Sequence, residues 1–477
     1  MKKSVAVAGV VVVAVAAYTG VSWYVGVQAE KTIRASIERA NARIIKSIGP
    51  DVGTLGARIE INDYRRGLFS TEARYAIVVQ DEEERLELGM ADHMQHGPFP
   101  WALVKQGVLA PQLAYSQSQL VDTDTVKRWF DAARGNMPLE VDTRIGLGGK
   151  GVSTWSFAPL EWAVEGERLS FSGGQMEIRF SNDFRDSVGE GQFASLEMGQ
   201  APDGDRLAIK EIQLQSRTTT AADETVEVHS TLEAGAIALY DHNEEVVNVD
   251  TAVVTLDSRQ QADLLDATLR YDFKRVLMSG IDLGSVTLGG EIQRFHVDAF
   301  SALLAEYDAI AMEHGAGEGE EFDLTPEDED RLLAKMRPAL ASSPAVALRP
   351  VLWSNEKGES KLALSANFQP LPADVTAADG GVDTALKEMQ FELVLSRPML
   401  LQAFAQTGSG EAEQKQLEML GALMYDRYVN ELEREGLLRR DGDRAVVDIV
   451  YVDGNVDVNG QSMSLEEFLG LFGAFLM

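Results

Sequence analysis

Two histidines three positions apart, His93 and His96, come nearest to a reactive site in this chain. Imidazoles at such spacing could bind one metal ion, for which Asp92 is the only carboxylate nearby. However, the chain contains no cysteine, and Pro98 and Pro100 make the following segment extended. A histidine before a Gly-Pro pair more often stabilises a turn. The sequence therefore predicts turn residues here and no metal site.

The run Ser172-Gly173-Gly174 is a second candidate, either as a nucleophile or as a cradle for phosphate. It lacks the Gly-x-Ser-x-Gly pattern of a nucleophile elbow and the Lys-Ser or Lys-Thr of a phosphate loop. Adjacent glycines between strands are typical of a bulge or a tight turn. Four other histidines have no partner at a suitable spacing: His229, His242, His296 and His314. We therefore expect no catalytic residue, no cofactor and no enzymatic activity.

A basic and aromatic string, Tyr64-Arg65-Arg66-Gly67, could contact an anionic headgroup or a glycan. The simpler interpretation is the end of a strand, where the tyrosine packs inward and the arginines pair with acidic residues. The second interpretation needs no ligand, and we prefer it.

Composition excludes several classes of function. The chain has 477 residues, enough for a large core, and its 75 acidic and 43 basic residues leave a net charge of -32. Such a charge repels phosphate backbones, so nucleic acid is not expected as a partner. The absence of cysteine excludes disulfides and thiolate metal sites.

Residues 1–29 have the pattern of a transmembrane anchor. No charged residue occurs from Ser4 to Ala29, and a helix over Val5–Val27 would be roughly 35 Å long, enough to cross a hydrocarbon core of about 30 Å. A cleaved signal peptide is the alternative, but its apolar region is usually shorter. Lysines precede and follow the run, so the charge count leaves the side of the body open.

Residues 30–50 are predicted to form an amphipathic juxtamembrane helix that ends at Gly49-Pro50. Ile33, Ile37, Ala40 and Ile44 recur at spacings of three and four, which places them on one helix face. This stripe fits either a short coiled coil between two copies or a first helix that packs on its own body.

The remainder is predicted to be mainly β, an α+β fold with antiparallel strands that each bury one face. Strands are expected at 74–79, 139–147, 175–180, 207–215, 225–232, 246–256, 286–292, 362–368 and 391–395, with a hairpin at 445–458. Helices are expected at 297–312, 326–340, 411–435 and 464–475. The last begins with a capping box formed by Ser464 and Glu467. A glycine-rich acidic stretch divides a strand-rich body at 51–315 from a C-terminal α+β portion at 316–477.

Several strings together resemble the YdgA-like family of inner-membrane-anchored periplasmic proteins of Gram-negative bacteria. They are Tyr64-Arg65-Arg66-Gly67-Leu68-Phe69-Ser70, His96-Gly97-Pro98-Phe99-Pro100, Phe171-Ser172-Gly173-Gly174, Leu352-Trp353-Ser354-Asn355, Val458-Asn459-Gly460-Gln461 and Ser464-Leu465-Glu466-Glu467. The resemblance covers nearly the whole chain. It implies a single inner-membrane helix, a body in the periplasm and no established activity, with the string residues in structural roles.

Two functions follow as expectations. The first is a non-catalytic binding or scaffolding protein of the cell envelope, acting as a homo-oligomer or with other envelope proteins. The second is a lipid-binding or lipid-transfer protein with an apolar groove formed by its sheets, which is similar to AsmA-like proteins in architecture only.

Overall fold

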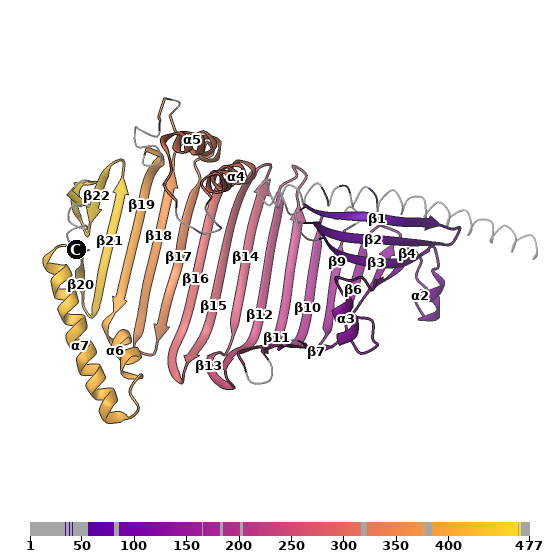
Figure 1. The fold of residues 1–477 in the computed structure, drawn as a ribbon, viewed down its shortest axis with the longest axis horizontal. Helices are drawn as coiled ribbons and strands as arrows, with labels where there is room; N and C mark the ends of the chain where they lie inside the picture. Colours follow the sequence, from indigo (N-terminus) through magenta and orange to yellow (C-terminus); the bar gives the residue numbers. More distant parts are fainter. Residues whose placement is uncertain are drawn as a thin grey trace, which may run out of the picture. The chain divides into compact units, whose positions relative to one another are not determined.

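The structure is a computed structural model that describes residues 34, 38, 41, 56–80, 85–164, 166–181, 185–200, 204–315, 322–372, 374–376, 384–465, 467 and 468 (Figure 1). Within these residues no helix combines the length and apolar character needed to cross a membrane. The anchor predicted at residues 1–29 lies outside the described residues and stays a prediction. Of the helix predicted at 30–50, the described residues Arg34, Glu38 and Asn41 are all helical.

The chain forms two compact units. Unit 1 comprises Met1–Pro202 with Glu211–Ala222, and unit 2 comprises Asp203–Lys210 with Asp223–Met477. Strand β11 (Arg206–Thr220) contributes residues to both. The sequence predicted a division near residue 315, whereas α4 (Val297–Glu313) and α5 (Pro326–Leu340), which flank that point, belong to one unit.

The described residues of unit 1 from Gly56 onward form an antiparallel sheet with two short helices. Neighbouring strands pair in the order β1-β2-β3-β4-β5-β6-β9-β10. Strand β8 lies beside β9 on the same side of β10, and β7, which follows β6, pairs with β8. The strands are β1 (Gly56–Arg66), β2 (Ser70–Gln80), β3 (Arg85–His96), β4 (Gln112–Leu120), β5 (Leu139–Gly146), β6 (Gly151–Phe157), β7 (Leu160–Val164), β8 (Glu167–Phe171), β9 (Gly174–Phe180) and β10 (Ser187–Gln200). The helices are α2 (Trp101–Lys105) and α3 (Lys127–Ala132).

The core of unit 1 lies between one face of this sheet and the segment that contains α3. Leu120, Leu139 and Val141 project from β4 and β5 and pack with Val126, which precedes the helix. Phe130 of α3 packs against the same cluster. Alternate residues of a strand share a face, so this helix covers the apolar side of the sheet.

Unit 2 is an antiparallel meander, as the sequence predicted. Its strands are β12 (Val226–Asp241), β13 (Glu244–Val249), β14 (Ala252–Gln261), β15 (Leu264–Met278), β16 (Ile281–His296), β17 (Ala345–Asn355), β18 (Gly358–Phe368), β19 (Leu386–Ser396), β20 (Arg439–Asp441), β21 (Arg444–Val452), β22 (Asn455–Val458) and β23 (Gln461–Ser464). The strand predicted at 246–256 is interrupted: β13 and β14 are successive pieces that both lie between β12 and β15.

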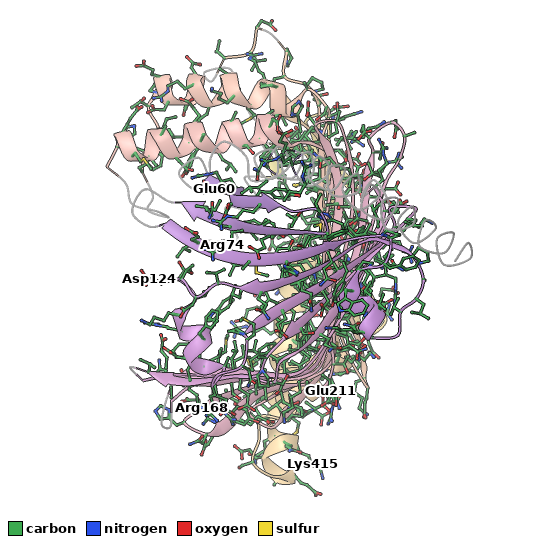
Figure 2. The ribbon with its side chains drawn as sticks, turned by 90° about the vertical axis from the view of Figure 1, so that its right-hand side faces the viewer. Glu60, Arg74, Asp124, Arg168, Glu211 and Lys415 are labelled. Atoms are coloured by element: carbon green, nitrogen blue, oxygen red, sulfur yellow. The ribbon has the colours of Figure 1, made fainter. Side chains whose placement is uncertain are left out.

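In the part of unit 2 that the structure describes, four helices connect the strands. In the sequence, α4 and α5 come between β16 and β17, and α6 (Arg397–Ala405) and α7 (Glu411–Arg434) follow β19. In space, α4 and α5 lie side by side (Figure 1, Figure 2). The positions predicted for α4, α5 and α7 are confirmed, whereas α6 was not predicted. The capping box is present, because Ser464 N donates to Glu467 Oε2 at 2.9 Å and Glu467 N donates to Ser464 Oγ at 3.2 Å. Most of the helix predicted beyond it lies outside the described residues.

Candidate functional site

His93 and His96 do not point to one place. Residues three apart on a strand project to opposite faces, and β3 buries His96 while His93 is exposed. On the buried face, Asp92 accepts hydrogen bonds from Ser116 and, at 2.9 Å, from Ser118. Burial and the neighbouring Asp92 raise the pKa of the Tyr75 hydroxyl. This buried cluster is a hydroxyl–carboxylate network and does not bring the two imidazoles together.

Two of the family strings meet at one end of unit 1. His96 N donates to Phe69 O at 2.8 Å, and a hydrogen bond of 2.8 Å joins Thr71 Oγ1 to His96 Nε2. Gly97 approaches β4 so closely that a Cβ on it would lie 1.8 Å from Gln112 O. Only glycine fits there. Tyr64, Arg66 and Gly67 belong to the β1–β2 end beside this contact, and Pro98, Phe99 and Pro100 to the segment that follows His96.

The other family strings lie at separate places. Gly173 joins β8 to β9 with φ of 70°, where a Cβ would lie 2.5 Å from Phe157 O, and Gly174 begins β9. Trp353 Nε1 in β17 donates to Leu283 O at 2.6 Å. Asn459 and Gly460 form the β22–β23 turn, where Asn459 Oδ1 accepts from Asp448 N at 3.0 Å. These residues fix junctions between strands, and the structure does not gather them into one site.

Among the described residues, Asp205, Asp241 and His242 are the group whose ligand atoms could reach one metal ion, all within 4.8 Å of one another. All three side chains are exposed, and His242 Nδ1 is hydrogen-bonded to Asp241. Exposed acidic groups of this kind are common without an ion. We assign no site to them.

A continuous apolar face runs across unit 2. Residues directly opposite each other in paired strands share a face, and the register joins Leu256 to Leu269, Leu348 to Leu364, and Leu364 to Phe391. The same rule extends this face over eight strands: β12, β14, β15, β16, β17, β18, β19 and β21. At about 4.8 Å between neighbouring strands, the seven steps span about 34 Å.

Large side chains on this face are exposed among the described residues. Eight of them are 37–44% exposed: Leu232, Leu256, Leu269, Tyr271, Leu288, Val346, Leu348 and Leu364. A groove of about 600 Å³ is hollowed into the face over β14–β19. Its lining includes Leu256, Leu269, Ile292, Leu348, Leu364 and Met389. This is the size of a ligand site, with walls that offer almost no hydrogen-bonding groups. We call this surface the apolar face.

The opposite face of the same strands is charged. Its ion pairs include Arg259 with Glu227 at 3.2 Å, Arg349 with Glu291 at 3.0 Å, and Lys361 with Glu392 at 2.7 Å. The hydrogen bond from Arg270 holds the pKa of Asp272 below its usual range. Strand alternation thus separates a wet face from an apolar one.

One end of the apolar face is covered. There, Val429 of α7 packs with Ala445 and Leu438, and Leu395, Tyr425, Leu432 and Val447 surround them. Leu395, Ala445 and Val447 continue the apolar face on β19 and β21. The open part therefore lies over the strands before this helix contact. Sequence reasoning found the alternation of these strands but predicted that each would bury its apolar side.

Comparisons with known proteins identify uncharacterised relatives. The sequence model of DUF945, described as a bacterial protein of unknown function, matches residues 1–466. Protein YdgA of Escherichia coli is 25% identical over 99% of this chain and 97% of its own length. The uncharacterised protein YihF of the same organism is 22% identical over 98% of each chain. No solved structure matches the chain.

Proposed function

The chain belongs to the DUF945 family of bacterial proteins of unknown function, and we propose that it is a non-catalytic, membrane-anchored protein of the cell envelope that binds lipid acyl chains. The apolar face of unit 2 is the binding surface in this proposal, residues 1–29 are the anchor, and the body lies in the periplasm. The observation that carries the proposal is the open apolar groove.

The free energy that burial of the apolar face would release favours a bound ligand. Each Å² of apolar surface left in water forgoes about 25 cal/mol of stabilisation. Soluble monomers seldom expose a contiguous apolar patch larger than a few hundred Å². A face of eight strands with side chains that are 37–44% exposed exceeds what scattered surface leucines would give. A ligand that covers it would recover this stabilisation.

The shape and chemistry of the groove favour acyl chains over a polar small molecule. An acyl chain reaches about 15 Å, half of a hydrocarbon core of about 30 Å, and the face spans about 34 Å. Glu291 is the ionisable residue of the groove lining, but its carboxylate pairs with Arg349 on the opposite face, and the rest of that lining is apolar or glycine. Such walls recognise hydrocarbon without selecting a headgroup.

The ladder arrangement argues against binding an extended peptide on this face. Strand addition requires an unpaired edge, whereas the strands that carry the groove, from β14 to β19, each pair with a neighbour on both sides. A protein partner would have to bind the side chains alone. We therefore prefer lipid to a scaffolding partner.

Photo-crosslinking in living cells tests this proposal on the full chain. A benzophenone amino acid replaces Leu364 in one variant and Ser365 in the control, because adjacent residues of β18 face opposite sides of the sheet. We expect lipid adducts at position 364, detected by mass spectrometry, and none at 365. Protein adducts at 364 would favour the scaffolding function, and equal lipid labelling at both positions would refute a specific face.

A further inference from the structure

One end of unit 1 exposes large apolar side chains in three neighbouring loops. They come from the β1–β2 turn, the β3–β4 connection that contains α2, and the β5–β6 turn. We call this surface the unit 1 tip. Its apolar members are Leu68, Phe69, Phe99, Trp101, Leu109 and Leu147, each 42–70% exposed.

The strand register places these loops together. Ser70, at the start of β2, pairs with Gln95 of β3, so the turn before β2 lies beside the connection after β3. Gln112, at the start of β4, pairs with Gly146, where β5 ends. Figure 1 shows α2 at the end of unit 1 toward which the β1 arrow points.

The connection that carries most of the tip is held firmly. Gly97 N donates to Leu113 O at 2.7 Å, and Gln112 N donates to Pro98 O at 2.8 Å, which closes its base. Leu103 of α2 is fully buried and ties the helix to the unit. Trp101 and Leu109 are therefore presented outward by a fixed backbone.

Basic residues surround the apolar members although the chain as a whole is strongly acidic. Arg65, Arg66, Lys105 and Lys150 belong to the same three loops or to the strand ends beside them. The Lys105 ammonium lies 5.8 Å from the centre of the Trp101 ring. Tryptophan and basic residues together are typical of the interface between lipid headgroups and acyl chains.

The N-terminal segment approaches this same end. The guanidinium of Arg34 lies 5.5 Å from the Tyr64 ring, near the end of β1, while Asn41 exchanges two hydrogen bonds with Ile59, of 2.7 and 2.9 Å. Chain direction from Asn41 back to Arg34 therefore runs toward the unit 1 tip. The uncharged run Ser4–Ala29 precedes Arg34 by only a few residues.

We propose that the unit 1 tip docks into the headgroup region of the bilayer that the N-terminal run enters, with its apolar side chains at the acyl boundary and its cations at anionic lipid phosphates. The tip thereby gives unit 1 a second attachment and a fixed orientation on the membrane. This surface is separate from the apolar face, and its docking does not depend on lipid binding by unit 2.

Depth-dependent quenching on the full chain tests the docking. Because the chain has no cysteine, Leu109→Cys and Val164→Cys each give a single labelling site for an environment-sensitive fluorophore. Both positions are exposed. Val164 pairs with Glu167, which pairs with Gln200 at the end of β10, so Val164 lies at the end of the unit 1 strands away from the tip. The labelled chains are reconstituted into liposomes of phosphatidylethanolamine and phosphatidylglycerol, or added to preformed ones if they do not insert.

We expect blue-shifted emission at position 109 and quenching by headgroup-level nitroxide lipids at least about twofold stronger than at position 164. Leu68→Ser with Trp101→Ser should reduce that quenching, and replacing phosphatidylglycerol with phosphatidylcholine should weaken it further. Circular dichroism checks that the variants stay folded. An aqueous, unquenched label at 109, or equal quenching at both sites, would overturn the proposal.

Discussion

Units 1 and 2 use the same strand alternation and treat its apolar side differently. In unit 1 the residues Leu120, Val126, Leu139 and Val141 are 1–7% exposed, because the segment with α3 packs on them. In unit 2 the corresponding side chains of β14–β18, such as Leu269 and Leu364, are 37–39% exposed. The strands themselves do not make this difference.

What differs is the presence of a covering element. A helix that packs on a sheet removes apolar area from water and stabilises the fold at about 25 cal/mol per Å². In unit 2 the described helices cover the apolar side at its margins, α7 near β19 and β21 and α5 at Phe368, the last residue of β18. An open apolar surface of this extent is expected where a ligand supplies the cover.

Leu120→Ala should give the largest loss of stability. Leu120 is buried in the unit 1 core, and truncating a buried leucine leaves a cavity that costs about 2–5 kcal/mol. Urea denaturation of the full chain, followed by tryptophan fluorescence, measures the change. Trp129, Trp155 and Trp162 report on unit 1. A loss under about 1 kcal/mol would mean that this core is not the main stabilising element of unit 1.

Leu269→Ala is the matched change on the apolar face and should cost only about 1 kcal/mol. Leu269 loses the same atoms, but its side chain is already partly in water and no cavity forms. Trp353 reports on unit 2 in the same denaturation experiment. A loss as large as that of Leu120→Ala in lipid-free protein would show that the face is covered, which would remove the contrast between the units.

Sequence alone predicted the strands and their alternation but not this contrast. Alternation of apolar and polar residues indicates which side chains share a face, as for Leu362, Leu364 and Phe368. It does not indicate whether another element packs on that face. In unit 1 the segment with Val126 packs on Leu120 of β4 and on Leu139 of β5, a contact that the alternation within the strands does not indicate. Likewise, the meeting of Phe69 with His96 depends on the β2–β3 register, which local patterns leave open.

The helices were easier to predict where their ends carry chemical signals. Thr325 and Pro326 begin α5 with a capping box that the sequence displays, and Ser464 with Glu467 does the same near the C-terminus. Helix α6 was not predicted, because Pro398, shortly after the strand expected at 391–395, is also a residue that ends strands. Proline is equally favoured in the first turn of a helix, and Pro398 lies in the first turn of α6.

Acid should loosen α4 and α5 while leaving α3 in place. Hydrogen bonds from Thr325 and His314 lower the pKa of Asp328 from 3.8 to about 2, and hydrogen bonds from Arg331 lower the pKa of Glu313 below 4.5. Because both folded values lie below the unfolded ones, their stabilisation is complete above about pH 4.5 and is lost as the pH falls toward 2. The contacts by which the segment with α3 packs on the core of unit 1 are apolar and do not titrate.

Hydrogen exchange measured by mass spectrometry distinguishes the two helix regions. Peptides from α4 and α5 should lose protection between pH 4.5 and 2, after correction for intrinsic exchange rates, and α3 peptides should not. Asp328→Asn serves as the control, since it removes the titrating group and should flatten the dependence in the lower part of this range. Simultaneous loss of protection in all three helices would indicate global acid unfolding instead.

Lys361→Gln on the charged face of unit 2 should give the smallest effect. Its ammonium lies 2.7 Å from Glu392, but the two side chains are 38% and 42% exposed. Water screens such pairs, so we expect a loss of about 0–1 kcal/mol that shrinks as salt is added. Lys274→Gln is the control, since the described residues give Lys274 no ion pair. A larger loss that does not change with salt would mean that the charged face is shielded from water. A small loss at both positions would mean that the charged face contributes little to the stability of unit 2, whose apolar face remains the part with stabilisation still to gain.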